Sequence, residues 1–345
     1  MRCHGYCAPQ KGAELVPFEF ERRSVGSNDV TIEILYCGVC HSDLSFVDNE
    51  WGISRYPLVP GHEIVGRVTA VGDRVVRFAV GDIAAIGCLI DSCRVCRRCE
   101  DGAEHLCEQG STMTYGGVER VSGRTTYGGY SNKYVVDERF ALSVPATLDP
   151  AGAAPLLCAG ITTYSPLHRW GVGGGQRIGV VGLGGLGHLA IKIARALGAD
   201  VVLFTTSPGK SEDARALGAC DVVISTDPEQ MKRYQAGLDF ILDTVSGVHD
   251  LNAYIRLLKS EATLCMLGIV PENLTLSAMT LIARRKVLAG SNIGGLRETQ
   301  EMLDFCGKHG IVADIERVAL RNINTAFQRL RRNDVKYRFV IDMSN

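Results

Sequence analysis

Four cysteines on one short segment are the residues of this chain with the clearest chemical meaning. They are Cys93, Cys96, Cys99 and Cys107. Zn²⁺ prefers thiolate ligands in four-coordinate, tetrahedral sites, so four cysteines this close in sequence can enclose one ion. A closed cage leaves no position for a substrate, and the segment therefore predicts a structural zinc site without catalytic chemistry. It also directs attention to a second, open zinc site elsewhere.

Cys40, His62 and Cys158 are candidates for that open site. Two thiolates and one imidazole leave a zinc ion one position for water or substrate. Because the three residues are far apart in sequence, a histidine and two cysteines buried in the core is an equally good interpretation of their spacing. Cys37 and Cys40 also form a C-x-x-C pair. A redox pair needs a thioredoxin-like βαβ context, whereas this one follows a strand in a β-rich region.

A glycine-rich segment, Gly182-Leu-Gly-Gly-Leu-Gly187, matches the pattern G-x-G-x-x-G. The pattern alone is weak, but here it follows a predicted strand, opens a predicted helix and is followed by a second strand. Such glycines let the backbone approach a pyrophosphate, and the helix N-terminus offers unpaired N–H groups to it. The segment predicts a dinucleotide site, and a purely structural turn is the alternative.

The residues after the second strand indicate which dinucleotide binds. An NAD site usually has Asp or Glu about 20 residues past the first glycine, to bind the ribose hydroxyls. This chain instead has Thr205, Thr206 and Ser207, with Lys210 close behind. The missing carboxylate, the hydroxyls and the nearby cation favour a 2′-phosphate, and therefore NADP(H). The alternative is that Lys210 is only a solvated residue at a helix start.

The elements that must position these residues change in character near residue 150. Before it, short β-branched runs separated by glycine turns are typical of an all-β, barrel-like domain. The predicted strands there span residues 30–36, 63–71, 82–88 and 134–136.

After residue 150, strands alternate with helices, which predicts a parallel sheet with helices on both faces. The fold class is thus α/β plus all-β. We expect a β-domain with the cysteine loop over 1–150, a nucleotide-binding domain over 151–290 and a C-terminal segment over 291–345. The predicted strands span 177–182, 201–205, 221–224, 240–243, 263–267 and 337–341, and the predicted helices 185–197, 212–217 and 298–308.

Composition limits the class of protein. The chain has 345 residues, 46% of them hydrophobic, and a net charge of −1, which predicts no nucleic-acid or membrane partner. No signal peptide or membrane span is predicted, and thirteen cysteines, an odd count, favour a reducing cytoplasm with metal-bound thiolates. The remaining cysteines, such as Cys220, Cys265 and Cys306, are predicted to be small buried hydrophobes.

Taken together, these motifs resemble those of the zinc-dependent medium-chain alcohol dehydrogenases. The branch most similar is that of the cinnamyl alcohol dehydrogenases, which includes NADPH-linked bacterial aldehyde reductases. The resemblance extends over nearly the whole chain in the family's order. It is carried by residues 37–43 (CGVCHSD), 59–63 (VPGHE), the 93–107 loop, 155–164 (PLLCAGITTY), 182–187 and 334–340 (DVKYRFV).

The resemblance implies a GroES-like β catalytic domain and a doubly wound Rossmann domain inserted before the C-terminal segment, with the active site in the cleft between them. It implies that Cys40, His62 and Cys158 bind the catalytic zinc, that Glu63 coordinates it transiently, and that Asp43 orients His62. It also implies that Ser42 starts the proton relay and that the four-cysteine loop holds the structural zinc. Implied NADP(H)-binding residues are His41, Thr162, Gly182, Leu183, Gly184, Gly185, Leu186, Gly187, Thr205, Thr206, Ser207, Lys210, Thr244, Gly268, Ser291, Asn292 and Ile293.

The function that follows from the resemblance is reversible reduction of aldehydes to primary alcohols by hydride transfer from NADPH, over a broad aromatic and aliphatic range. A homodimer formed by pairing of sheet edges is also implied. By alignment with the family, Trp51, Cys88, Asn292 and Ile293 face the substrate. Two alternatives are a zinc-independent, quinone-reductase-like enzyme and a non-enzymatic NADP(H)-binding redox sensor.

One position departs from the family pattern. Many relatives have a histidine three residues after the hydroxyl residue of the relay, and this chain has Ser45. A histidine exchanges protons near neutral pH, whereas a serine hydroxyl does not. We expect the relay to end at the cofactor ribose and water or at His41, with slower alcohol oxidation at neutral pH. A variant Ser45→His with an unchanged pH profile would contradict this expectation.

Overall fold

The computed structural model describes residues 1–270 and 272–344 and divides into two compact units. The first unit contains residues 1–161 and 294–345, and the second contains residues 162–293. Within the described residues, no helix is both long enough and apolar enough to span a membrane.

The first unit is built on an antiparallel arrangement around the long strand β3. Its main sheet has the order β16-β17-β3-β4-β5-β9, and β8 also pairs with β3. Val30, Ile32 and Ile34 alternate along β3 and are buried, which explains why this segment forms a strand with one face in the core. The strands of the unit are β1 (Arg2–Cys7), β2 (Val16–Glu21), β3 (Asp29–Val39), β4 (Ile64–Val71), β5 (Ile83–Ile86), β6 (Leu89–Asp91), β7 (Thr112–Met113), β8 (Lys133–Asp137), β9 (Leu142–Ser143), β16 (Ile315–Ala319) and β17 (Arg338–Asp342).

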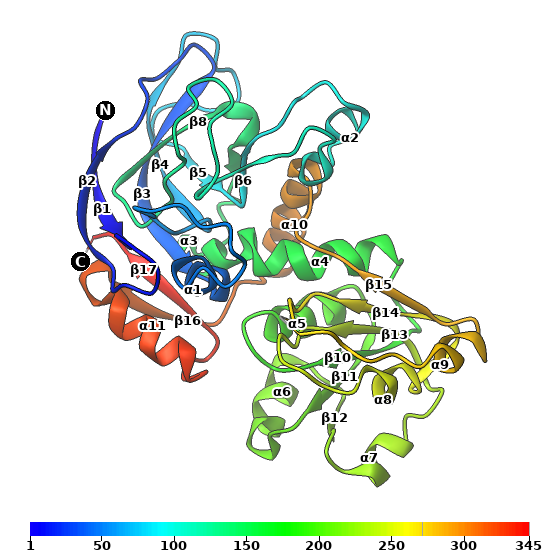
Figure 1. Cartoon of the computed structure of the whole chain (residues 1–345). Helices are drawn as coiled ribbons and strands as arrows, with labels where there is room; N and C mark the ends of the chain where they lie inside the picture. Colours follow the sequence, from blue (N-terminus) through cyan, green and yellow to red (C-terminus); the bar gives the residue numbers. More distant parts are fainter. Residues whose placement is uncertain (271, 345) are drawn as a thin grey trace. The chain divides into compact units, whose positions relative to one another are not determined.

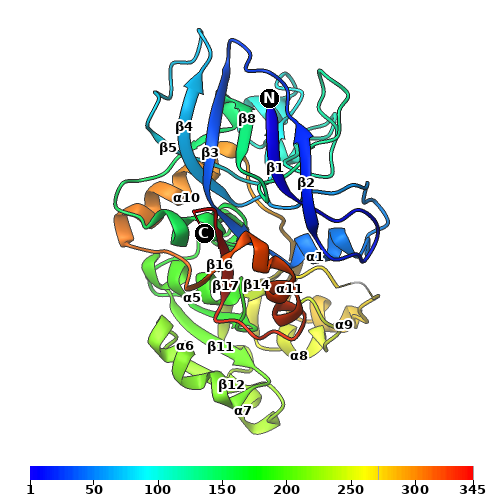
Figure 2. The same cartoon turned by 90° about the vertical axis from the view of Figure 1, so that its left-hand side faces the viewer.

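The end of the chain completes this sheet. Strand β17 pairs antiparallel with β3, so that Phe339 lies opposite Val39, and β16 pairs parallel with β17. Figure 2 shows β16, β17 and helix α11 next to the N-terminal strands of the same unit. The helices of the unit are α1 (His41–Val47), α2 (Arg97–Glu100), α3 (Pro150–Ala153), α10 (Leu296–His309) and α11 (Ile323–Arg331). Residues from both ends of the sequence therefore form one core.

The second unit is a doubly wound parallel sheet. Its strand order is β12-β11-β10-β13-β14-β15. Successive strands of the sequence are added on one side of β10 up to β12 and then on its other side from β13 onward, as in dinucleotide-binding folds. Every neighbouring pair is parallel, and the helices pack around the sheet (Figure 1). The strands are β10 (Arg177–Val181), β11 (Asp200–Thr205), β12 (Asp221–Ile224), β13 (Leu238–Asp243), β14 (Leu258–Met266) and β15 (Val287–Gly290). The helices are α4 (Ala159–Arg169), which begins in the first unit, α5 (Gly187–Ala196), α6 (Ser211–Leu217), α7 (Pro228–Lys232), α8 (Leu251–Ile255) and α9 (Ala278–Ile282).

The predicted fold class is confirmed, although sequence patterns missed several elements. The elements that were not predicted are strands β1, β2, β6, β7, β9, β15 and β16 and helices α1, α2, α3, α4, α7, α8, α9 and α11. Predicted strands and helices otherwise differ from the observed ones by a few residues at their ends. The expectation that Cys220 is buried is wrong, since its side chain is exposed just before β12. Every cysteine in the described part of the chain is a free thiol.

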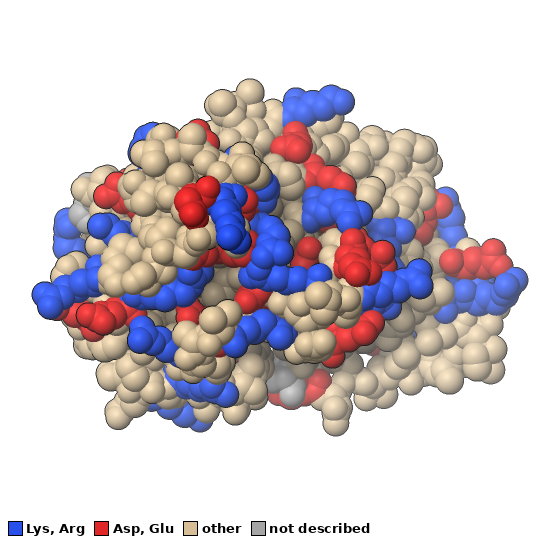
Figure 3. All heavy atoms as spheres, turned by 90° about the horizontal axis from the view of Figure 1, so that it is seen from above, with Lys and Arg blue, Asp and Glu red and all other residues tan. Residues whose placement is uncertain are grey.

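Charged side chains on the face seen in Figure 3 are of both signs. Lysine and arginine alternate there with aspartate and glutamate, and neither sign covers a broad area. This mixture agrees with the net charge of −1. The field that this face presents to solvent is therefore weak at distances beyond about 10 Å, where salt screens it.

Candidate active site and metal sites

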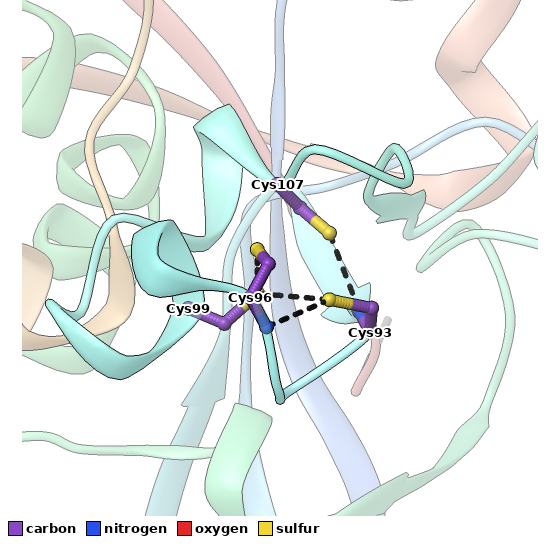
Figure 4. A group of neighbouring side chains, drawn as sticks. All are labelled: Cys93, Cys96, Cys99 and Cys107. Atoms are coloured by element: carbon purple, nitrogen blue, oxygen red, sulfur yellow. Dashed lines mark hydrogen bonds between the residues drawn. The ribbon is translucent and has the colours of Figure 1, made fainter.

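The cysteines of the loop, Cys93, Cys96, Cys99 and Cys107, lie around one shared space (Figure 4). Their sulfur atoms lie within 4.8 Å of one another. The Sγ atoms of Cys93 and Cys99 are 3.8 Å apart, and those of Cys96 and Cys99 are 3.5 Å apart. A tetrahedron with Zn–S bonds of about 2.3 Å has edges of about 3.8 Å. The sulfur positions therefore fit one zinc ion.

Backbone N–H groups in this loop point at sulfur atoms. The amide of Cys96 donates to Cys93 Sγ at 3.3 Å, and the amide of Cys93 donates to Cys107 Sγ at 3.4 Å. Backbone donors, that of Glu108 first, lower the pKa of Cys96 to about 6. Burial, in contrast, raises the pKa of Cys99 to about 12, so that Cys96 is the thiol of this pair that favours the metal-binding thiolate form.

A second cluster brings together Cys40, His62, Glu63 and Cys158, whose ligand atoms lie within 4.8 Å of one another. The Sγ atoms of Cys40 and Cys158 are 3.9 Å apart, again close to the edge of a zinc tetrahedron. Cys40 lies between β3 and α1, His62 and Glu63 precede β4, and Cys158 follows the 3₁₀ turn Ala154–Leu157. Contact between the thiols lowers the pKa of Cys40 and raises that of Cys158. The three predicted ligands and Glu63 are thus assembled in the first unit.

The imidazole of His62 is held from two sides. Its Nδ1 lies 3.4 Å from Oδ1 of the buried Asp43, which leaves Nε2 available to a metal. The ring of Tyr115 stacks on it with a centroid distance of 5.6 Å and an interplanar angle of 30°. Asp43 also accepts a hydrogen bond from the Cys40 amide at 2.9 Å, which fixes the first turn of α1. One carboxylate thus links two of the predicted ligands.

Glu63 forms a buried ion pair that sequence reasoning missed. Its Oε1 accepts from the guanidinium of Arg338, and its Oε2 has no partner. Burial raises the pKa of Glu63, and the charge of Arg338 opposes that rise. Gly38 makes room for the carboxylate, because a Cβ there would lie 1.8 Å from Oε2. An arginine inside the apolar strand 338–342 was the signal for this pair, because a buried cation needs a buried anion.

The other predicted catalytic residues lie on α1. His41 and Ser42 are its first residues, directly after Cys40, and Ser45 is one turn further on. Ser42 is half-buried and His41 is exposed. The N-terminal turn of α1 thus carries a hydroxyl beside a predicted zinc ligand.

The predicted cofactor residues, apart from His41, lie in the second unit or at its boundary, Ile293. Gly182 has φ = +89°, and a Cβ on Gly187 would lie 2.1 Å from the carbonyl oxygen of Gly182. A Cβ on Gly184 would meet only open space. Gly182 thus forms the tight turn, Gly187 allows close packing of helix and strand, and Gly184 leaves space for a pyrophosphate to approach the backbone. Thr244 fixes the loop by donating to the carbonyl of Val181 at 2.7 Å.

The residues expected at the 2′-phosphate surround the end of β11. Thr205 is buried and its hydroxyl accepts from the amide of Ser207 at 3.1 Å, whereas Thr206 is exposed. Lys210 Nζ donates to the carbonyl of Leu183, in the glycine-rich loop, at 2.8 Å. The lysine thus lies against the glycine loop and does not extend into solvent. Thr162, Gly268, Ser291 and Asn292 lie on other segments of the same unit.

His249 and Asp243 form a pair behind the loop that carries Thr244. His249 Nε2 lies 2.7 Å from Asp243 Oδ2, and its Nδ1 lies 2.8 Å from the Gly247 carbonyl. Because both nitrogens face acceptors, the doubly protonated ring is favoured, and the hydrogen bond to Asp243 raises the pKa of His249.

The pair predicts a pH-dependent stability. A raised folded-state pKa stabilises the fold fully below the unfolded value of about 6.5, and this contribution is lost as pH rises through the folded pKa. We expect His249→Gln to reduce the free energy of unfolding by about 1 kcal/mol at pH 6, and by less at pH 8.5. Thermal melts of both proteins at the two pH values measure this. A difference that grows with pH would contradict the assignment.

Comparison with known proteins agrees with this geometry. Residues 26–146 match the model of the alcohol dehydrogenase GroES-like domain, and residues 185–308 match that of zinc-binding dehydrogenases. The aldehyde reductase YahK of Escherichia coli is 52% identical over 330 residues, which cover 95% of this chain and 94% of YahK. Cinnamyl alcohol dehydrogenase 2 of Rauvolfia serpentina is 50% identical over 347 residues, which cover 100% of this chain and 96% of the relative.

A solved structure of a relative has the same fold over the whole chain. The crystal structure of a CAD from Helicobacter pylori complexed with NADP(H) is 39% identical and has a TM-score of 0.94. The match covers 100% of this chain and 99% of that one. The family models, the two relatives and this structure agree over both units. The chain therefore belongs to the zinc-dependent medium-chain alcohol dehydrogenases, in the branch of the cinnamyl alcohol dehydrogenases and aldehyde reductases.

Proposed function

We propose that this chain reduces aldehydes to primary alcohols with NADPH, reversibly, and binds two zinc ions, one in each cysteine-containing cluster. The observation that carries the proposal is the cluster of Cys40, His62 and Cys158, which offers three ligands and an open position. A zinc-independent enzyme or a binding protein has no need for such a site. The loop Cys93–Cys107 supplies the closed, structural site.

The chain's own residues prepare the reaction. When bound, zinc polarises a carbonyl oxygen as a Lewis acid, and the reduced nicotinamide supplies hydride. Ser42 donates a proton toward the oxygen as negative charge develops there. Asp43 holds His62 in the tautomer whose Nε2 can bind a metal. Ser45 cannot extend the relay as a histidine would, so the proton that Ser42 donates is replaced from water through the cofactor ribose or His41, and the same route carries protons out during alcohol oxidation.

Glu63 and Arg338 set the charge balance beside the thiolates. The carboxylate is neutralised by Arg338 through Oε1, which also lies 4.0 Å from His62 Nε2, while Oε2 is buried beside Gly38 without a partner. A carboxylate in this position can take up a ligand place transiently when water and substrate exchange. The pair thus supports exchange at the open position without leaving a permanent extra charge in the site.

Preference for NADPH is supported by the residues after β11. Residues 205–210 include no carboxylate to repel a 2′-phosphate, and they provide Thr205, Thr206 and Ser207 as donors and Lys210 as a cation. A relative of the same branch has been solved in complex with NADP(H). A charged hydrogen bond contributes about 1.5–3 kcal/mol, so one lysine can change cofactor preference by about 10- to 100-fold.

The lysine is tested by Lys210→Ala. We expect kcat/KM for NADPH to fall by about 10- to 100-fold and that for NADH to change less than threefold, because only NADPH carries the 2′-phosphate. Steady-state rates with both cofactors measure this. Lys232→Ala, on the exposed surface of α7 in the same unit, is the matched control and should alter neither value. An equal fall for both cofactors would mean that Lys210 only supports the glycine loop through Leu183.

A broad aldehyde range is supported by an aromatic series in the first unit. Trp51 packs edge-on against Phe46 at 5.1 Å, Phe46 packs against Tyr115 at 5.0 Å, and Tyr115 stacks on His62. Aromatic side chains that extend to a predicted zinc ligand suit both phenyl and alkyl substituents, since neither needs a polar partner. Initial rates with one aromatic and one aliphatic aldehyde test this range. Strong discrimination between them would contradict it.

The proposed assembly is a homodimer joined at β15. This strand forms one edge of the parallel sheet, and an unpaired edge is a template for pairing with a second copy. Exposed apolar side chains gather on and near it, namely Ile269, Met279, Ile282 and Val287. Light scattering is expected to give the mass of two chains, and Val287→Lys to give that of one. A monomeric parent protein would contradict this assembly.

The function itself is tested with zinc-replete protein and an aldehyde. Aldehyde-dependent oxidation of NADPH, with little oxidation of NADH, is the expected result. A protein that binds zinc and NADPH but turns over no aldehyde would indicate the non-enzymatic alternative. Turnover that survives loss of zinc from the open site would indicate the zinc-independent, quinone-reductase-like alternative.

A further inference from the structure

A segment that follows the cysteine loop, Tyr127–Ser131, pairs with the segment that carries His62. The amide of Gly128 donates to the carbonyl of Val59 at 2.8 Å, and that of Gly129 donates to Gly61 at 2.8 Å. The amide of Tyr130 donates to the carbonyl of Pro60 at 3.0 Å. Residues 127–131 therefore fix the conformation of the backbone just before His62 through hydrogen bonds.

The two segments are too close for side chains between them. A Cβ on Gly128 would lie 2.2 Å from the Pro60 carbonyl oxygen, and one on Gly129 would lie 2.4 Å from Ile64 Cγ1. Gly61 has φ = +103°, and a Cβ there would lie 2.7 Å from the Tyr130 ring. Since only glycine avoids these overlaps, the spacing of the two backbones is fixed by sequence.

Tyr130 also reaches the carboxylate that faces His62. Its hydroxyl donates to Asp43 Oδ2 at 3.0 Å, and both side chains are fully buried, with 0% exposure. Oδ2 also accepts from the amide of Cys40, whereas Oδ1 accepts from the amide of Gly61 and faces His62 Nδ1. The phenol thus holds one oxygen of Asp43 so that the other points at the imidazole.

Arg22 also holds the segment Tyr127–Ser131 in place. Its guanidinium donates to the carbonyls of Tyr127, Gly128 and Lys133 at 2.7–2.8 Å and to the hydroxyl of Ser131 at 2.9 Å. Its planar group also lies 4.0 Å from the centroid of the Tyr134 ring. Five donors in a rigid fork suit this set of acceptors, and a lysine could not reproduce it.

We propose that Tyr130 is a positioning residue for the zinc ligand His62, acting through Asp43, and that Arg22 holds the segment that carries Tyr130. The inference rests on the proposed function, because it takes His62 to bind zinc. Hydrogen-bond partners outside the ligand shell typically alter metal affinity by 10- to 100-fold. Tyr130 is one hydrogen bond further out, so a smaller effect of about 3- to 10-fold is expected.

The test is the rate at which zinc leaves the Cys40, His62 and Cys158 cluster when a chelator is added. Tyr130→Phe removes only the hydroxyl, and its zinc is expected to leave about 3- to 10-fold faster than that of the parent protein. Zinc of the cysteine loop serves as an internal reference, since its release should not change. Zinc release from the two sites is expected in two kinetic phases. The phase of the open site is identified as the one that is absent when Cys158→Ser is measured.

Tyr134→Phe is the matched control. Tyr134 is also buried, lies close by in β8 and donates its hydroxyl to the Thr114 carbonyl at 2.7 Å, not to Asp43. Both variants lose one buried hydroxyl donor, so they should be similarly destabilised to heat, but only Tyr130→Phe should release zinc faster. Equal release from the two variants would overturn the proposal.

The absorption spectrum of bound Co²⁺ and the variant Arg22→Lys distinguish a change at the metal site from a general loss of stability. With Co²⁺ in the open site, Tyr130→Phe should shift the ligand-field bands, because the imidazole is less well oriented, while Tyr134→Phe should not. Arg22→Lys keeps the charge but not the fork, and should shift release in the same direction as Tyr130→Phe. Unchanged bands and release in both variants would contradict the inference.

The outcomes separate this inference from the proposed function. If Cys158→Ser holds as much zinc as the parent protein, the open zinc site itself is absent and the proposed function fails. If the parent protein loses one zinc on that substitution but Tyr130→Phe behaves like Tyr134→Phe, only the role of Tyr130 fails.

Discussion

Cys158→Ser is expected to reduce kcat/KM for aldehyde by at least about 1,000-fold while the chain stays folded. A thiolate binds zinc and a neutral serine hydroxyl does so poorly, so the open site should lose its ion. Lewis-acid stabilisation of the developing oxyanion contributes several kcal/mol, and about 4 kcal/mol corresponds to this factor. Zinc content should fall from two ions per chain to one. Metal analysis and NADPH oxidation on the same sample measure both quantities.

Cys37→Ala is the matched control for this variant. Cys37 is buried and lies three residues before Cys40, but it is not part of the metal-ligand cluster. We expect it to keep both zinc ions and activity within about threefold of the parent. Loss of activity in Cys37→Ala, with both zinc ions retained, would instead support a redox pair of Cys37 and Cys40.

Loss of the loop zinc is expected to affect stability and not chemistry. Cys107→Ser removes one of the four sulfurs of the closed site, and structural zinc binding contributes about 10 kcal/mol or more in small zinc-binding peptides. The loop is also tied to α10, because the amide of Leu296 donates to Glu104 at 2.9 Å. We expect about 4 kcal/mol of destabilisation, or a fall in Tm of about 10 °C, with kcat at 20 °C changed less than threefold.

Calorimetry and zinc analysis check this result. Cys220→Ser, at an exposed thiol outside both clusters, should leave Tm and zinc content unchanged. An unchanged Tm after loss of the loop zinc, together with a large loss of kcat, would mean that the loop takes part in catalysis.

The motifs that sequence could locate are those whose residues are close together. The four cysteines of the loop lie on one segment of fifteen residues and the glycines of 182–187 on one of six, so their spacing alone limits the geometry. The parallel sheet also followed from short apolar strands between helical segments. Cys40, His62 and Cys158 were different, because spacing alone left them ambiguous and only the family resemblance joined them.

Contacts between distant segments could not be predicted. Arg338 meets Glu63 because β17 pairs with β3 across almost the whole chain, and Tyr130 reaches Asp43 through a loop. No local periodicity encodes such pairs. Helix α1 was missed because its start depends on Asp43 accepting from the amide of Cys40, a capping contact in which a cysteine stands where a serine or threonine usually marks a helix start. Cys220 was misjudged because apolar neighbours in sequence do not fix burial.

The fate of deuterium from NADPH labelled at C4 of the nicotinamide tests the central claim most directly. With zinc-replete protein and an aldehyde, we expect the alcohol product to carry one deuterium on its hydroxyl-bearing carbon, seen as a gain of one mass unit. Cys158→Ser should yield almost none. A parent protein that holds two zinc ions and binds NADPH, yet forms no labelled alcohol, would contradict the account of this chain as an aldehyde reductase.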